Sequence, residues 1–129
     1  MNASPPPKPT ASELEILQVL WERGPSTVRE VHRTLSGKRP MGYTSVLKLM
    51  QIMTAKGTLR RNEDQRAHVY EAVQPAEKTK CQLALDVLER VFEGSASDLM
   101  MHALAGRKAS REEIEEMRRL LREYERRVR

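Results

Sequence analysis

Three helix-start signals divide this chain and restrict what it can fold into. Each is a capping box, in which Ser or Thr is followed three residues later by Glu. They are Thr10–Glu13, Thr27–Glu30 and Ser110–Glu113. In a capping box each of the two side chains hydrogen-bonds the other residue's backbone N–H, so the helix begins at a defined residue. Gly24 and Pro25 stand between the first two boxes and are typical helix ends. The sequence therefore predicts short helices over residues 11–22 and 28–35.

Apolar spacing and turn residues predict the elements that follow. Residues 43–56 form a third helix that stops at Gly57, and two strand-like runs, Thr58–Asn62 and Ala67–Val73, then form a hairpin. A fourth helix is expected over residues 76–93. A fifth is expected to begin after its N-cap, Ser95, and a sixth to begin at residue 111. The last helix carries apolar residues at spacings of 3, 4, 3 and 4, the spacing of a coiled-coil seam. They are Ile114, Met117, Leu121, Tyr124 and Val128.

This order of elements predicts a mainly α fold in three parts. Residues 1–9 are a Pro-rich tail, which we expect to be disordered. Residues 10–74 form a winged helix-turn-helix domain with a small two-stranded β wing. Residues 75–129 form a helical domain with too few residues for a good core of its own, so we expect it to dimerise.

Charge is distributed unevenly along the chain. There is no Asp or Glu between Glu30 and Glu63, although the chain holds 18 acidic residues. The whole chain has a net charge of +5 and a pI near 9.7. A one-sign segment favours an acidic partner, and nucleic acid is the commonest one.

Several classes of protein are disfavoured by the residue content. The single Cys81 excludes an internal disulfide, and no apolar run approaches the roughly 20 residues of a membrane span. The sequence contains no phosphate-binding glycine loop, no nucleophile–base pattern and no cluster of histidines with carboxylates. We therefore expect a cytoplasmic protein that is not an enzyme and binds no metal or cofactor.

The helix-turn-helix pattern predicts which side chains would meet DNA. In such a module the second helix of the pair, here the one expected over residues 43–56, enters the major groove, and its first residues approach bases and phosphates. The candidates on this helix are Tyr43, Thr44, Ser45 and Lys48. Nearby cations that could neutralise phosphates are Lys38, Arg39, Arg60 and Arg61.

The chain resembles the penicillinase-repressor (BlaI/MecI) family of bacterial transcriptional regulators over about residues 10–125. The matching segments are TASELEILQVLWERGPSTVREVHRTL, GYTSVLKLMQIMTAKGTLRR, RAHVYEAV, VFEGSASDLMMHAL and SREEIEEMRRLL. The resemblance implies a repressor that binds dyad-symmetric operator DNA as a homodimer. It adds Ser26 and Thr27, at the start of the second helix, and Arg66, at the wing tip, to the expected DNA contacts.

The dimer interface would be formed by apolar residues of the last three helices. Those expected in it are Leu88, Phe92, Leu99, Leu104, Ile114, Met117, Leu121 and Tyr124.

Many family members are inactivated by a cut linked to a membrane sensor protease, at an Asn-Phe pair in the best-known ones. His102 and Ala103 stand at that position here, and Gln65 stands where the family often has Gly.

Two other functions remain open from the residues. A winged helix can bind a protein partner, although such a module would not need the acid-free segment. A ligand-responsive regulator is a third class, for which the low aromatic content of 4% gives no sign of a pocket.

Overall fold

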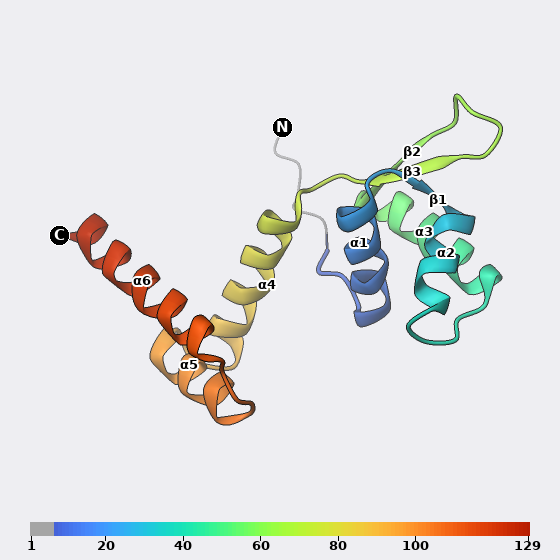
Figure 1. Ribbon diagram of the computed structural model, residues 1–129. Coiled ribbons are helices and arrows are strands. Elements are labelled where there is room, and N and C mark those ends of the chain that lie inside the picture. The colour runs from blue at the N-terminus through green and yellow to red at the C-terminus, as the bar shows by residue number, and fades with distance from the viewer. Residues whose placement is uncertain (1–6) are drawn as a thin grey trace. The chain divides into compact units, whose positions relative to one another are not determined.

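A computed structural model describes residues 7–129 and confirms a mainly helical fold with a β wing (Figure 1). Residues 1–6 of the expected tail lie outside the described part. The elements follow in the order α1 (Ala11–Arg23), β1 (Ser26–Thr27), α2 (Val28–Ser36), α3 (Tyr43–Lys56), β2 (Leu59–Asn62), β3 (Val69–Ala72), α4 (Ala76–Arg90), α5 (Ala96–Ala105) and α6 (Arg111–Val128). The chain divides into two compact units, residues 1–83 and 84–129, and the division falls within α4. The expected boundary after residue 74 stays a prediction.

The first two capping boxes form as the sequence predicts. The Glu13 N–H donates to Thr10 Oγ1 at 3.2 Å, and the Thr10 N–H donates to the Glu13 carboxylate at 3.0 Å. The Thr27–Glu30 box has the same two bonds at 3.2 and 2.9 Å. These local bonds explain why α1 and α2 begin where the sequence places them.

The third box is only half formed. Ser110 caps α6 by accepting from the Glu113 N–H at 3.0 Å. The Glu113 carboxylate accepts two hydrogen bonds from Arg107 instead, at 2.6 and 2.7 Å. A guanidinium bond to a carboxylate is stronger than a bond from a neutral N–H, so Arg107 competes successfully for this side chain.

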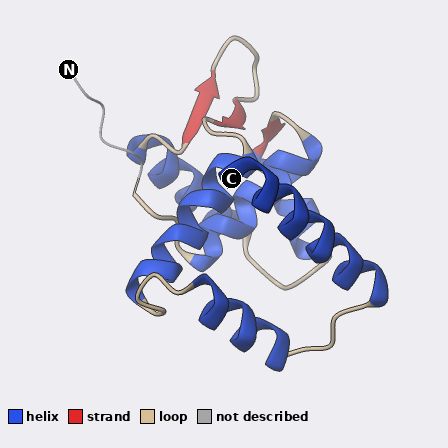
Figure 2. Ribbon diagram, turned by 90° about the vertical axis from the view of Figure 1, so that its left-hand side faces the viewer, coloured by secondary structure: helices blue, strands red, loops and turns tan. Residues whose placement is uncertain are grey.

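The sheet has three strands, not the expected two. Its order is β1-β3-β2, both pairings are antiparallel, and the strands are red in Figure 2. The extra strand, β1, pairs Ser26 with Tyr70 and Thr27 with Val69. A two-residue strand has no alternation to detect, and Thr27 was already assigned as a helix cap. Sequence pattern alone could not reveal this strand.

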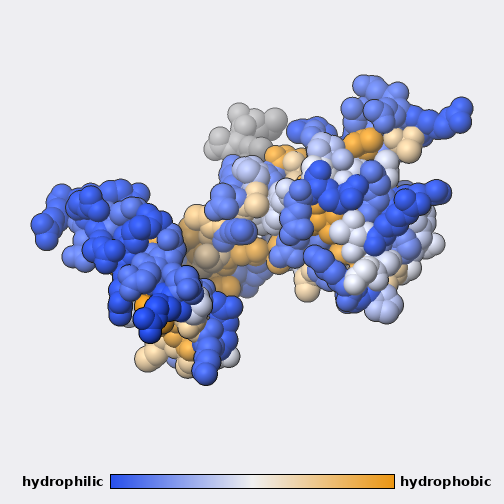
Figure 3. Space-filling view, viewed as in Figure 1, coloured by the Kyte–Doolittle hydropathy of each residue, from blue (hydrophilic) through white to orange (hydrophobic). Residues whose placement is uncertain are grey.

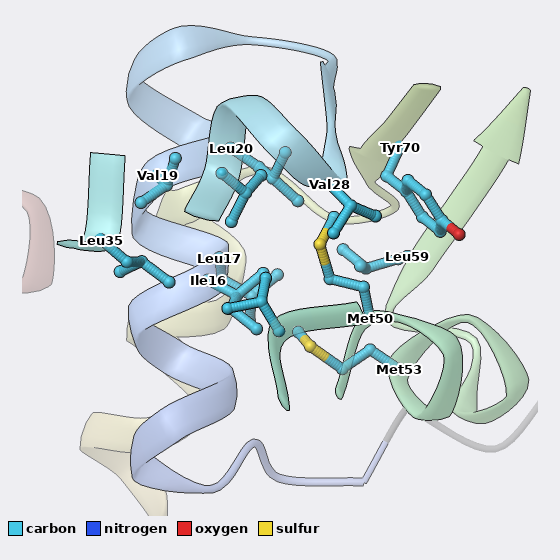
Figure 4. Packing of buried hydrophobic residues seen from close by; sticks show 12 residues of the cluster. Ile16, Leu17, Val19, Leu20, Val28, Leu35, Met50, Met53, Leu59 and Tyr70 are labelled. Atoms are coloured by element: carbon cyan, nitrogen blue, oxygen red, sulfur yellow. The ribbon is translucent and has the colours of Figure 1, made fainter. Parts of the chain in front are cut away.

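The hydrophobic core of the first unit joins α1, α2, α3 and the sheet (Figure 4). Its buried apolar residues are Ile16, Leu17, Val19, Leu20, Val28, Val31, Leu35, Val46, Met50, Met53, Leu59 and Tyr70. Trp21 packs against this cluster, and its Nε1–H donates to the Gln74 carbonyl at 3.0 Å. The core therefore fixes α3 against α1, α2 and the sheet.

The second unit has a different character, because none of residues 84–129 is buried in the single chain. Its exposed apolar side chains include Leu85, Val91, Met101, Leu104, Leu121 and Tyr124. Figure 3 shows hydrophobic surface over α5 in this view.

Helix α4 ends at Arg90, three residues before the expected end, because a turn with positive φ at Glu93 and Gly94 follows.

Candidate nucleic-acid interface

Helix α3 has one buried face and one exposed face. Val46, Met50 and Met53 are fully buried and anchor the helix in the core. Residues 43–45, Lys48, Gln51 and Ile52 are exposed. The spacing of the buried residues matches the helical period, so the exposed residues lie on the remaining surface. The helix thus presents a row of mostly polar side chains from its N-terminus onward.

The beginning of α3 is favourable for an anion. Its N-cap is Gly42, which provides no side-chain cap, and the first turn holds no acidic residue. The first N–H groups of a helix have no partner within the helix and carry partial positive charge. Thr44 and Ser45 add short hydroxyl groups at the same place. This geometry allows close contact with a phosphate or a base edge.

Sequence reasoning missed a contact that holds this region. The His32 Nε2 lies 2.8 Å from the carbonyl oxygen of Met41, just before α3. Because a carbonyl only accepts, Nε2 carries the proton and donates it. The His32 ring also lies edge-on to the Tyr43 ring, with centroids 5.7 Å apart and an interplanar angle of 83°. From the sequence, His32 was only a histidine in the second helix without the spacing of a metal ligand, and nothing in the pattern indicated a contact with Met41 or Tyr43.

The loop cations differ from one another in their surroundings. Lys38 is exposed in the loop between α2 and α3. Arg39 forms an ion pair of 2.7 Å with Glu15 on α1 and also contacts Ser12. Arg39 therefore ties the loop to α1, a role that its charge alone did not predict. Its contribution to phosphate binding stays a prediction.

The wing cations are also partly paired. Arg60 bonds Glu71 across the strand pair at 2.8 Å, and these residues are register partners. Arg61 pairs with Glu63 at 3.3 Å. The hydrogen bond with Tyr70 and the nearby Glu63 carboxylate hold the pKa of Arg61 above its ordinary value. Arg66 is exposed in the loop that joins β2 and β3.

Ser26 and Thr27 lie where the wing sheet meets α2. Ser26 is 1% exposed, and its hydroxyl donates to the Gly24 carbonyl at 2.9 Å. The phosphate contact expected at Ser26 stays a prediction, although the side chain itself has little exposed surface. Thr27 is half-buried and uses its oxygen to cap α2. The family resemblance suggested a contact here, but the burial of Ser26 depends on β1, which the sequence did not predict.

A partly buried ion pair fixes the far end of α3. Lys56 Nζ lies 2.9 Å from a Glu13 carboxylate oxygen, and the Glu13 side chain is 4% exposed. Burial acts to raise the pKa of Glu13, but the hydrogen bonds from Lys56 and Thr10 outweigh it and leave the pKa below its ordinary value. The carboxylate that caps α1 thus also holds the last turn of α3. Capping was predicted for Glu13, and this second role was not.

The residues expected in a dimer interface are open to solvent or half-buried in the single chain. Leu104, Ile114, Leu121 and Tyr124 are exposed, whereas Leu88, Phe92, Leu99 and Met117 are half-buried. A groove of about 660 Å³ runs between α5 and α6, lined by Leu104, Ile114, Met117 and Leu121 among others. Their place in an interface stays a prediction.

The residues at the expected cleavage position lie within a helix. His102 and Ala103 are exposed near the end of α5, and His102 Nδ1 lies 3.2 Å from Asp98. A protease binds its substrate in an extended form, so this part of α5 would have to unwind before a cut.

Residues 7–129 contain neither a metal-binding group of side chains nor a membrane-spanning helix. No group of three or more His, Cys, Asp or Glu side chains in this range could hold a metal ion. No helix in the same range is long and apolar enough to span a bilayer.

Three helices with a β wing, and an α3 whose polar side is free, define a winged helix-turn-helix protein. Sequence comparison gives the family: the chain matches the family model described as "Penicillinase repressor" over residues 9–123 and belongs to this family. It is 31% identical to the transcriptional regulator BlaI of Mycobacterium tuberculosis over 115 residues, 88% of this chain and 82% of the relative. It is 23% identical to the penicillinase repressor of Bacillus licheniformis, covering 94% of each chain.

A structural neighbour supports the fold alone. The chain aligns over its full length with a point mutant of ZitR from Lactococcus lactis, covering 82% of that chain, with 16% identity and a TM-score of 0.50. The family and the curated relatives together indicate a transcriptional repressor of the BlaI/MecI type.

Proposed function

We propose that this repressor binds dyad-symmetric operator DNA as a homodimer, with α3 of each chain in the major groove. The observation that carries the proposal is the exposed side of α3. Thr44, Ser45 and Lys48 lie there, while the opposite side of the helix is fixed in the core. A rigid helix with one free polar side is the element that the major groove admits.

The charge around α3 supports DNA over a protein partner. Exposed cations lie in the loop before α3, on α3 itself and in the loop between β2 and β3, namely Lys38, Lys48 and Arg66, and the acid-free segment spans the whole helix. Arg60 and Arg61 hold exposed acidic partners that a phosphate can replace, since such pairs contribute little in water. A module built for a neutral protein surface would have no use for this arrangement.

The second unit supports pairing of two chains. Its apolar side chains are exposed in the single chain, and an exposed seam of this kind would favour aggregation unless it were covered. A two-fold dimer would place two α3 helices about 34–36 Å apart, or a multiple of that distance, to match palindromic half-sites.

A repressor must both reach its operator and be released from it. We propose that it acts in the cytoplasm, where its DNA is, and that a membrane sensor protease can release it. The position of His102 and Ala103 within α5 supports cleavage only after local unwinding. The Asn-Phe pair typical of the best-known relatives is absent.

The test is a titration of duplex DNA at increasing salt. If each dimer neutralises about 6–10 phosphates, affinity should fall by roughly 10³–10⁵ between 50 and 200 mM salt. The probe is a duplex selected from random-sequence DNA by the wild-type protein, and a scrambled duplex of equal length is the control. Absence of any selected sequence, or an affinity that salt does not change, would overturn the proposal.

A further inference from the structure

His32 connects helix α2 to the first residues of α3. Its Nε2–H donates to the Met41 carbonyl at 2.8 Å, and Ser36 Oγ lies 3.2 Å from the same nitrogen. Its ring edge meets the ring of Tyr43, the first residue of α3. One half-buried side chain therefore fixes both the backbone before α3 and an aromatic residue at its start.

The segment before α3 needs such a link. The loop from Gly37 to Gly42 contains two glycines and Pro40, and it provides no side-chain cap for α3. Glycine keeps many backbone conformations open in a loop, so the direction of the peptide before α3 depends on tertiary contacts. Arg39 holds the middle of this loop to α1, and His32 holds its end.

Tyr43 gains most from the contact with His32. Tyr43 is 45% exposed, so the core does not determine its rotamer. An exposed tyrosine samples several χ1 rotamers, and an edge-to-face ring contact favours one of them. Holding that rotamer before DNA arrives reduces the entropy lost on binding.

We propose that His32 is a positioning residue for DNA recognition: it presets the Tyr43 ring and the peptide before α3 without itself touching DNA. The inference rests on the proposed function, since it assigns a role within the same site. It predicts energetic coupling between His32 and Tyr43 in DNA affinity. It also predicts no coupling between His32 and Lys48, which is on the same helix but is exposed one turn further along.

The experiment is a pair of double-mutant cycles, measured on the duplex selected by the wild-type protein. His32→Ala should lower affinity roughly 5- to 10-fold, within the range of one good contact. In the Tyr43→Ala background the same change should cost less than about 2-fold, because its main partner is already lost. In the Lys48→Ala background it should cost the full factor.

Two conservative variants separate positioning from general stability. His32→Gln keeps an N–H donor for Met41, and His32→Phe keeps a ring edge for Tyr43. At least one of them should recover affinity relative to His32→Ala. Thermal melting followed through Trp21 identifies a temperature at which every variant is folded, and His32→Leu, which keeps neither the N–H donor nor the ring edge, serves for the cycles if His32→Ala melts too early.

The outcomes separate this inference from the proposed function. Equal losses in the Tyr43→Ala and Lys48→Ala backgrounds would overturn the positioning role, as would an unchanged affinity of His32→Ala. Failure of both conservative variants to recover affinity would also contradict it. If the wild-type protein selects no duplex at all, the proposed function fails first and the inference falls with it.

Discussion

Replacing Lys56 with Met removes the cation from a nearly buried carboxylate. The Glu13 side chain is 4% exposed and Lys56 is 35% exposed, with 2.9 Å between Nζ and the carboxylate oxygen. Breaking a fully buried pair costs about 3–5 kcal/mol. Because Lys56 is partly in water and Glu13 keeps the Thr10 N–H, we expect a smaller loss of roughly 1–3 kcal/mol. For a unit of this size that lowers Tm by roughly 4–24 °C.

The assay is thermal unfolding followed by the fluorescence of Trp21, at one fixed protein concentration. Trp21 is the only tryptophan and packs against the core of the first unit. The control is Lys48→Met, which makes the same chemical change on the exposed side of α3. The double variant Glu13→Gln/Lys56→Met should melt above Lys56→Met, because it leaves no unpaired buried charge. Equal melting temperatures for Lys56→Met and Lys48→Met would refute the reasoning.

Four further predictions concern pH, the helix end, sequence discrimination and assembly. The folded-state pKa of Glu13 lies below its unfolded value of 4.5, so Glu13 stabilises the fold fully above that pH and loses this contribution as the pH falls. The Glu13→Gln variant should therefore show a weaker dependence of the free energy of unfolding on pH in acid. Gly57→Ala should cost about 1 kcal/mol in chemical denaturation, since φ is +89° there, whereas no loss would show that the helix end relaxes freely. Thr44→Ala should weaken binding to the selected duplex by ~1–3 kcal/mol and leave the scrambled duplex nearly unchanged, whereas Arg61→Ala should weaken both; equal losses for Thr44→Ala would contradict its role. Leu121→Asp should place a charge in the dimer seam, give monomers in sedimentation and sharply weaken operator binding, and a monomer that binds the full operator at wild-type affinity would rule out the two-fold clamp.

Local signals predicted most element boundaries of the first unit. The boxes at Thr10 and Thr27 define the start of α1 and α2, and Gly57 closes α3 with a positive φ that favours glycine. These features act over a few residues, so the sequence shows them directly. The exposed side of α3 followed from the same helical period, because burying Val46 and Met50 determines which residues remain outside.

Contacts between distant residues were not predictable in the same way. The pairing of Ser26 with Tyr70 gives β1 and buries the Ser26 hydroxyl, yet two residues carry no strand pattern. The Arg39–Glu15 pair turns an expected phosphate contact into a loop tether as well. Such pairs depend on how the helices cross, and no spacing within one helix specifies that.

Among residues 7–129, all buried apolar side chains lie in the first unit, and this bears on the order of folding during synthesis. Every buried apolar residue of the core lies between Ile16 and Tyr70, and the partly buried apolar residues packed against it lie between Leu14 and Ala72, so the winged helix holds its complete core once residues 14–72 have left the ribosome. Residues 84–129 emerge last, and none of them is buried in the single chain. Domains generally fold as units in the order of their synthesis. In the proposed dimer, the winged helix therefore folds on the nascent chain, whereas the apolar side chains of the C-terminal helices become buried only when a second chain binds.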